Sequence, residues 1–186
     1  MTRRPLTKES KGSDGVKIKK LASLALLTAI ALTIFVIEQQ IPPLIPVPGV
    51  KLGLSNIVTV FTVFYIGSKE GAAVLFCRIF LGAIFSGNFS TFLYSAAGGL
   101  CAIAITIGMR RLVSKKQIWV AGVLGAIGHS IGQMFAAVVI TRTNSLLFYL
   151  PIMIFISIFT GAATGLCAQI LVNRGGKLWK TIFSWL

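Results

Sequence analysis

The sequence predicts an all-α polytopic membrane protein built as a bundle of six transmembrane helices. Two observations are that 55% of the 186 residues are hydrophobic and that the mean hydropathy is +0.88. A third is the placement of charge, because between Leu21 and Leu171 nearly every charged residue falls between apolar runs. Only Arg78 lies well inside one of these runs. A charge in hydrocarbon is costly, so Arg78 is expected to be paired or functional.

The apolar runs define the predicted spans. A hydrocarbon core of about 30 Å takes roughly 20 residues of helix. The runs lie at 21–38, 52–68, 71–87, 90–109, 118–140 and 145–171. The second and third are short, so they are expected to tilt less or to thin the bilayer locally. The last is long enough to tilt or break, and Pro151 near its start marks the expected kink.

The basic residues predict the orientation and the organisation of the chain. An N-inside arrangement places fifteen of the 18 Lys and Arg residues on the cytoplasmic side and only Lys51 and Arg142 outside. This bias follows the positive-inside rule, so both termini are expected in the cytoplasm. The predicted parts are a basic tail at 1–20, expected to be disordered, a transmembrane domain at 21–171 and a second basic tail at 172–186.

The net charge of +14 does not indicate a nucleic-acid partner. The basic residues cluster at positions that flank the predicted spans. Anionic lipid head groups account for cations at such positions. The expected surroundings are therefore the lipid bilayer, with no nucleic acid.

The motifs of catalysis are missing from the sequence. The segment 175–177 lacks the glycine spacing and the following Ser or Thr of a phosphate-binding loop, so no ATP hydrolysis is expected here. The four acids, Glu9, Asp14, Glu38 and Glu70, form no intramembrane cluster that would hold a Mg²⁺ ion. The three cysteines have no metal-ligand spacing and are expected to be buried as small apolar residues. The chain is predicted to be no enzyme by itself and to hold no metal or cofactor.

One face of the first predicted helix carries small residues. Ala22, Ala25 and Ala29 recur at intervals of three or four, and Thr33 and Val36 continue the same face. Small residues at this spacing let another helix approach closely. The face is expected either to pack within the protein's own bundle or to dock a partner subunit.

The segment 38–56 after that helix is apolar but rich in proline. Pro42, Pro43, Pro46 and Pro48 exclude a regular helix. A polar outer loop would not need the Ile, Leu and Val side chains between them. The segment is expected to form a semi-rigid lid over a binding cavity, and a loop on the membrane surface is the alternative.

Arg78 lies in the third predicted span. Its helical face is shared by Gly71, Leu75, Gly82 and Phe85. This face is expected to point inward, because arginine rarely faces lipid, with Gly82 leaving room for the guanidinium. A guanidinium forms bidentate bonds to carboxylate or phosphate. Two roles stay open: pairing with Glu38 or with carbonyl groups, and direct contact with an anionic substrate.

Other polar side chains mark a candidate pocket near the outer surface. Asn56 lies at the mouth of the second span, and Tyr94 follows the polar turn at 86–91. His129 and Gln133 lie one turn apart in the fifth span, where His129 forms either an interhelical hydrogen bond or a contact in the pocket. Close backbone packing is expected at Gly125, Gly128, Gly132, Gly161 and Gly165.

Three stretches of the sequence resemble a known family. They are IPPLIPVPGVKLGLSNIVTVF at 41–61, FCRIFLGAIFSGNFSTFLYSAAGGL at 76–100 and GVLGAIGHSIGQ at 122–133. Together they resemble the bacterial membrane family described both as Gx transporters and as component I of heptaprenyl diphosphate synthase, over about residues 20–170. Six short spans and a small-residue first helix are also similar to the substrate-binding S components of energy-coupling factor (ECF) importers.

The resemblance to ECF S components implies a division of labour in the bacterial plasma membrane. A transmembrane coupling subunit would contact Ala25 and Ala29, with Ala22 beside them, and two cytoplasmic ATPases would hydrolyse the ATP. The substrate would lie near the outer face, under the first loop. The expected binding residues are Arg78, Asn56, Tyr94, His129, Gln133 and Glu38, with Arg78 holding the anion.

The predicted function is therefore the substrate-capture subunit of an ECF-type importer for a small, anionic and partly apolar molecule, such as a precursor of isoprenoids or quinones. An alternative is a membrane accessory subunit of heptaprenyl diphosphate synthase, in which Arg78 binds a diphosphate and a partner supplies the catalytic carboxylates. A structural scaffold is the third hypothesis. An outward pocket at Arg78 would favour capture, whereas a seal against Glu38 would favour the scaffold.

Overall fold

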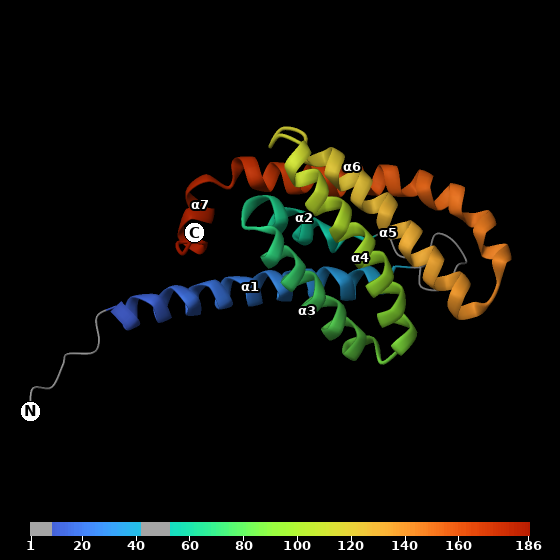
Figure 1. Cartoon of the computed structure of the whole chain (residues 1–186), viewed down its shortest axis with the longest axis horizontal. Helices are drawn as coiled ribbons and strands as arrows, with labels where there is room; N and C mark the ends of the chain where they lie inside the picture. The colour runs from blue at the N-terminus through green and yellow to red at the C-terminus, as the bar shows by residue number, and fades with distance from the viewer. Residues whose placement is uncertain (1–8, 42–52) are drawn as a thin grey trace, which may run out of the picture.

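The computed structural model describes residues 9–41 and 53–186, and every regular element in this part of the chain is a helix (Figure 1). The elements are α1 (Glu9–Gln39), α2 (Asn56–Tyr65), α3 (Ser68–Ser86), α4 (Phe89–Leu112), α5 (Ile118–Thr141), the 3₁₀ helix η1 (Asn144–Tyr149), α6 (Leu150–Arg174) and α7 (Gly176–Ile182). The all-α prediction is confirmed. α1 begins inside the predicted first tail, and α7 lies inside the predicted second tail.

Four helical segments are long and apolar enough to cross a membrane, and they match four of the predicted spans. They cover Gly15–Gln39, Phe89–Leu112, Ile118–Thr141 and Asn144–Arg174. The last one breaks near its start, because η1 gives way to α6 at Leu150 and Pro151 lies in the first turn of α6. Proline is tolerated there, since its missing N–H would have no partner within the helix.

The second and third predicted spans are helical but differ from the other four. α2 has ten residues, and at 1.5 Å per residue these cover about 15 Å, roughly half of a hydrocarbon core. α3 has 19 residues but carries Lys69, Glu70 and Arg78. A count of six full spans and a cytoplasmic position for both termini therefore stay predictions.

Glycines let α5 lie against the backbones of both α4 and α6. A Cβ atom on Gly132 would lie 2.5 Å from the carbonyl oxygen of Ala97 in α4. Toward α6, a Cβ atom on Gly122 would lie 2.5 Å from the Cα atom of Gly165. The close backbone packing predicted at the glycines of α5 and α6 is confirmed.

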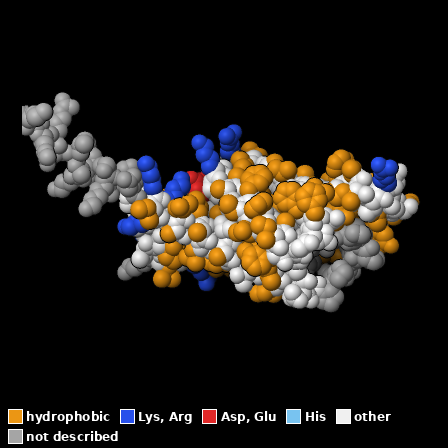
Figure 2. Space-filling view, turned by 90° about the horizontal axis from the view of Figure 1, so that it is seen from below, with side chains coloured by type: hydrophobic (Ala, Val, Ile, Leu, Met, Phe, Trp, Pro, Cys, Tyr) orange, Lys and Arg blue, Asp and Glu red, His pale blue; other side chains and the backbone are white. Residues whose placement is uncertain are grey.

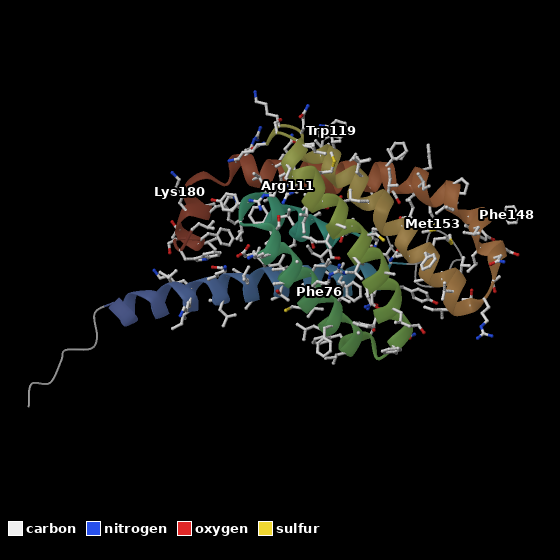
Figure 3. All side chains as sticks on the ribbon, viewed as in Figure 1. Phe76, Arg111, Trp119, Phe148, Met153 and Lys180 are labelled. Carbon is white, nitrogen blue, oxygen red and sulfur yellow. The ribbon has the colours of Figure 1, made fainter. Side chains whose placement is uncertain are left out.

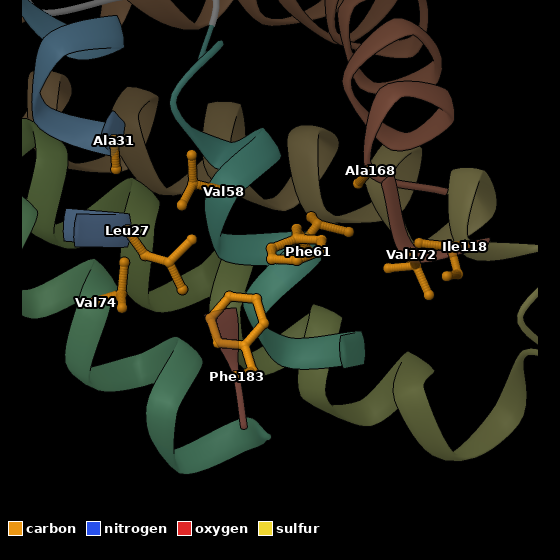
Figure 4. Close-up of a cluster of buried hydrophobic side chains, with 10 residues drawn as sticks. Leu27, Ala31, Val58, Phe61, Val74, Ile118, Ala168, Val172 and Phe183 are labelled. Atoms are coloured by element: carbon orange, nitrogen blue, oxygen red, sulfur yellow. The ribbon is translucent and has the colours of Figure 1, made fainter. Parts of the chain in front are cut away.

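The largest apolar cluster joins residues that are far apart in the sequence (Figure 4). Its buried members are Leu27, Ala31, Val58, Val60, Phe61, Val74, Ile118, Ala168, Val172 and Phe183. Phe183, just after α7, lies against Phe61 of α2 with ring centroids 6.2 Å apart. The C-terminal segment therefore folds back onto α2 and completes the core beside that short helix.

Basic side chains gather at one end of the bundle, as the visible face in Figure 2 shows. This basic end comprises Lys17, Lys19, Lys20, Lys69, Arg110, Arg111, Lys115, Lys116, Arg174 and Lys180. Lys20 donates a hydrogen bond of 2.6 Å to Glu70, and this bond lowers the pKa of Glu70 below its usual value. Arg110 donates to the Ser68 hydroxyl at 3.2 Å. These contacts hold α1, α3 and α4 together at the basic end.

The cysteines lie elsewhere than predicted. Cys77, Cys101 and Cys167 are exposed on the surface of the bundle, not buried. The prediction was wrong because a helix that is apolar on all sides does not reveal which face points inward. Their surface is shared with large apolar side chains such as Phe148, which is 87% exposed and points away from the bundle (Figure 3). In a bilayer this surface contacts hydrocarbon, where a small, weakly polar thiol is tolerated.

We expect Gly165→Val to lower the thermal unfolding midpoint of the protein in detergent. A Cβ atom there would lie 2.7 Å from the Trp119 carbonyl oxygen, and overpacking of this kind costs about 1–3 kcal/mol. Gly108→Ala is the matched control, because nothing lies within 4 Å of a Cβ atom at that position. The control should keep or raise the midpoint, since alanine favours helix over glycine. A Gly165→Val midpoint equal to that of the wild type would contradict the described packing of α5 on α6.

Candidate functional site

Arg78 points into the bundle from α3. Only 3% of its surface is exposed, so the predicted inward orientation is confirmed. Gly71, Leu75 and Gly82 lie on the same buried face. Phe85 was expected there too, but it is 70% exposed. The prediction for Phe85 is wrong because a helical wheel gives direction only, and not how far the neighbouring helices extend along α3.

The ring of Phe35 in α1 covers the guanidinium. The Cζ atom of Arg78 lies 5.5 Å from the centroid of this ring. A cation over an aromatic face recovers part of the electrostatic energy that burial removes. A Cβ atom on Gly82 would lie 2.7 Å from the same ring. Gly82 therefore makes room for Phe35, which corrects the expectation that Gly82 admits the guanidinium directly.

Glu38 in the last turn of α1 connects three helices. Its side chain is buried, with 4% of its surface exposed, and it lies within electrostatic reach of Arg78. The same carboxylate accepts hydrogen bonds from the backbone N–H groups of Gly53 at 2.5 Å and Leu54 at 3.1 Å. Gly53 has a φ of +75°, a conformation that glycine adopts at little cost. Glu38 thus joins the end of α1, the chain leading into α2 and Arg78 of α3.

His129 and Gln133 of α5 lie on the other side of the site. They are 5% and 1% exposed, and His129 is within electrostatic reach of Arg78. Gly98 of α4 approaches both, because a Cβ atom there would lie 2.9 Å from the His129 ring and 2.7 Å from Cγ of Gln133. Any larger residue at position 98 would push these side chains apart.

Asn56 at the start of α2 completes the arrangement. The position of a Cβ atom on Gly53 would be 3.0 Å from Nδ2 of Asn56 and 3.7 Å from Cδ2 of His129. The structure thus brings five of the six predicted binding residues into one region. This polar cluster consists of Glu38, Asn56, Arg78, His129 and Gln133.

Tyr94, the sixth predicted binding residue, packs elsewhere. It is buried in a second apolar cluster with Met134, Ala137 and Met153, the last of which is labelled in Figure 3. It precedes Gly98 by one turn of α4. The sequence places Tyr94 near a polar turn, but it does not show that the Tyr94 ring packs against Met134 and Met153.

Several polar atoms of the cluster are buried without a hydrogen-bond partner among the described residues. They are Nε and Nη2 of Arg78 and Oδ1 of Asn56. Buried polar groups are nearly always satisfied by protein, water or ligand. The cluster therefore offers donors and an acceptor to a small polar molecule.

A hollow of about 10 Å³ lies between α2, α3, α4, α5 and α6, next to the cluster. It is lined by Asn56, Thr59, Val60, Leu75, Ala102, Thr106, Gly122, Gly125, Ala126 and Thr164. This volume accommodates about one water molecule and no larger ligand. Sequence reasoning missed the three threonines, although Gly161 and Gly165 on either side of Thr164 were a signal of a close interhelical contact there.

The small-residue face of α1 points away from the bundle. Ala22, Ala25 and Ala29 are exposed, whereas Ser23 and Leu27 on the other side of α1 are buried. The first of the two expected roles, packing within the protein's own bundle, is therefore not what the described helices do. Docking of a partner at this face stays a prediction.

The proline-rich segment cannot be assigned a place in the site. Residues 42–52, which include all four prolines and Lys51, lie outside the described residues. The prediction of an apolar lid over the site falls on this segment and stays a prediction. Its two flanks are described, and Glu38 holds them together through Gly53 and Leu54.

The comparison with known protein families identifies the relatives of this chain. A family model described as heptaprenyl diphosphate synthase component I matches residues 27–171, which is more than half of the sequence. No curated protein and no solved structure matches this chain. The matched region contains the whole polar cluster and ends before α7. Component I is the accessory, non-catalytic subunit of its synthase, and the chain is not an enzyme by itself. The chain belongs to the heptaprenyl diphosphate synthase component I family.

Proposed function

We propose that this chain is the membrane accessory subunit of a polyprenyl diphosphate synthase and that it works with a separate catalytic component. The observation that carries this proposal is the family match over residues 27–171. The catalytic component would supply the carboxylates and Mg²⁺ that diphosphate chemistry needs. This chain would supply a membrane location for that component and for its product.

The distribution of charge supports this role. A polyprenyl diphosphate has a long apolar chain that dissolves in the bilayer and an anionic head that stays at its surface. The basic end offers exposed cations for such a head group or for an acidic face of the catalytic component, among them Lys69, Arg111, Lys115 and Lys116. Glu70, the acidic residue described at this end, is already paired with Lys20.

The basic end suits a diphosphate better than Arg78 does. The guanidinium of Arg78 is buried, is covered by Phe35 and has Glu38 as its counter-charge. A diphosphate would have to displace Glu38 and lose its own hydration deep in the bundle, which is costly for a multiply charged ion. We therefore place the expected diphosphate contact at the basic end.

A variant of the turn between α4 and α5 tests this role. We expect Lys115→Gln/Lys116→Gln to weaken recovery of the catalytic prenyl synthase component from native membranes about fivefold, because two exposed charge contacts together contribute about 1 kcal/mol. The readout is quantitative mass spectrometry of the tagged protein purified in mild detergent. Arg142→Gln, at the opposite end, is the control and should leave recovery unchanged. If wild-type protein brings down no prenyl synthase, the accessory role is excluded.

Capture of a small anion for an ECF-type importer is the second candidate, and the exposed face of Ala22, Ala25 and Ala29 favours it. Small residues that no helix of the same chain covers allow a helix of another subunit to approach closely. In this function a transmembrane coupling subunit would occupy that face, and two cytoplasmic ATPases would hydrolyse ATP. The polar cluster would hold the anion, for example an isoprenoid or quinone precursor, after opening beyond its present size.

The importer hypothesis predicts that a variant of α1 loses a different set of partner proteins during purification. Ala25→Leu/Ala29→Leu should abolish co-purification of a coupling subunit and its ATPases, because leucine side chains would keep the partner helix at a distance. Ile30→Leu, a conservative change at an exposed position of the same helix, should retain them. If no ATPase accompanies the wild-type protein, this candidate fails while the accessory role is unaffected.

The Glu38–Arg78 pair predicts a stability effect that holds for either function. Glu38→Gln would leave the buried guanidinium without its counter-charge, and breaking such a pair costs about 3–5 kcal/mol. The thermal unfolding midpoint in detergent should fall steeply. Glu38→Gln/Arg78→Met removes both charges and should recover much of the loss. If the single variant is as stable as the wild type, then Glu38 is not the counter-charge of Arg78.

A further inference from the structure

The C-terminal helix α7 lies beyond the family-matched region, which ends at residue 171. It lies at the basic end, between the C-terminal end of α6 and the part of α1 around Ser23 (Figure 1). The Nε1 atom of Trp179 donates to the carbonyl oxygen of Leu171 in α6 at 2.6 Å. The Ser23 hydroxyl of α1 donates to the carbonyl oxygen of Ile182 at 3.1 Å. α7 is thus fixed at its middle and at its C-terminal end by hydrogen bonds to α6 and α1.

The inner side of α7 is aromatic and packed. Trp179 lies 5.1 Å from Phe61 between ring centroids, and Phe183 lies 5.5 Å from Tyr65. Trp185 donates from Nε1 to the Ser23 hydroxyl at 3.1 Å. This packing fixes the rotation of α7 about its own axis, so the direction of its opposite side is also set.

The outer side of α7 is apolar and exposed, and so is Leu186, four residues beyond the helix. Leu178, Ile182 and Leu186 are 72%, 39% and 64% exposed. Lys180, on the same turn of helix, points away from the bundle in Figure 3. A short segment that crosses the end of a transmembrane bundle, with apolar residues outward and cations beside them, is typical of a helix in the interface of a bilayer.

The charges around α7 indicate the chemistry of its contact. Arg174 just before α7 and Lys180 within it are exposed, and Lys19 and Lys69 are exposed at the same end. Lys20 lies 5.3 Å from the centroid of the Trp185 ring while it pairs with Glu70. The described residues at this end leave a surplus of positive charge next to an apolar strip. Its complement is a surface that is anionic at the head groups and apolar beneath them.

We propose that α7 is an interfacial anchor that inserts Leu178, Ile182 and Leu186 into the bilayer leaflet at the basic end and gathers anionic phospholipid around itself through Arg174 and Lys180. The membrane is the occupant, because a soluble acidic protein would not require three exposed apolar side chains. The residues that hold α7, Leu171 and Ser23, belong to segments that are long and apolar enough to cross a membrane. The proposal is independent of either function proposed above.

The test measures which lipid touches α7. The whole chain carrying Trp119→Phe keeps two tryptophans, Trp179 and Trp185, both in the α7 region. It is reconstituted into nanodiscs of equal parts phosphatidylcholine and phosphatidylglycerol, in which one lipid or the other has brominated acyl chains. Because a basic residue near the surface contributes about 1 kcal/mol toward anionic lipid, brominated phosphatidylglycerol should quench at least about twofold more than brominated phosphatidylcholine.

Three variants test the charged and the apolar parts of the anchor separately. Arg174→Gln/Lys180→Gln should equalise quenching by the two lipids, whereas Arg142→Gln at the opposite end should keep the preference. Leu178→Ser/Ile182→Ser should reduce quenching by both. Unchanged thermal unfolding midpoints verify that these variants fold. The proposal is overturned if the two lipids quench the wild type equally, if neither quenches it, or if the preference survives the loss of Arg174 and Lys180.

Discussion

The structure depends on how the positive charge of Arg78 is held inside an apolar bundle. An unpaired charge in this environment is strongly destabilising, so its partners have to be fixed in place. Glu38 supplies the opposite charge, and Phe35, one turn earlier in α1, covers the guanidinium. Because Glu38 also accepts the N–H groups of Gly53 and Leu54, the same carboxylate sets where α2 begins. The Glu38 carboxylate, which binds Gly53 and Leu54 and lies within electrostatic reach of Arg78, therefore links α1 to the chain entering α2 and to α3.

Much of the fold can be predicted from sequence because a long apolar run in a bilayer has few alternatives to helix. The inward direction of Arg78 follows in the same way from the cost of charge in hydrocarbon. Contacts between helices do not follow, since nothing in the sequence shows that Phe35 fills the space at Gly82 or that Tyr94 packs among methionines. α7 gives no periodic signal, because seven residues are too few to display one.

The two candidate functions place different demands on the molecule. An accessory subunit uses its basic end and its long apolar helices, and both are present among the described residues. A capture subunit needs room for cargo, and the hollow beside the polar cluster holds about one water molecule. A ligand larger than water in this hollow would require the helices around it to separate, among them α4 and α5, which are in contact at Gly98 and His129. The family match is why we place the accessory role first.

Because the three cysteines are exposed on the surface of the bundle, a probe attached to each thiol can report the depth of that position in a bilayer. Cys77, Cys101 and Cys167 sit on α3, α4 and α6, at different distances from the helix ends. A spin label on each would report its own immersion in the bilayer through collisions with oxygen or with a water-soluble relaxant. Three such depths define how far α3 enters the hydrocarbon and how the bundle tilts. Each depth is read from a variant in which the other two cysteines are replaced by serine, so the three native thiols serve as markers without an introduced cysteine.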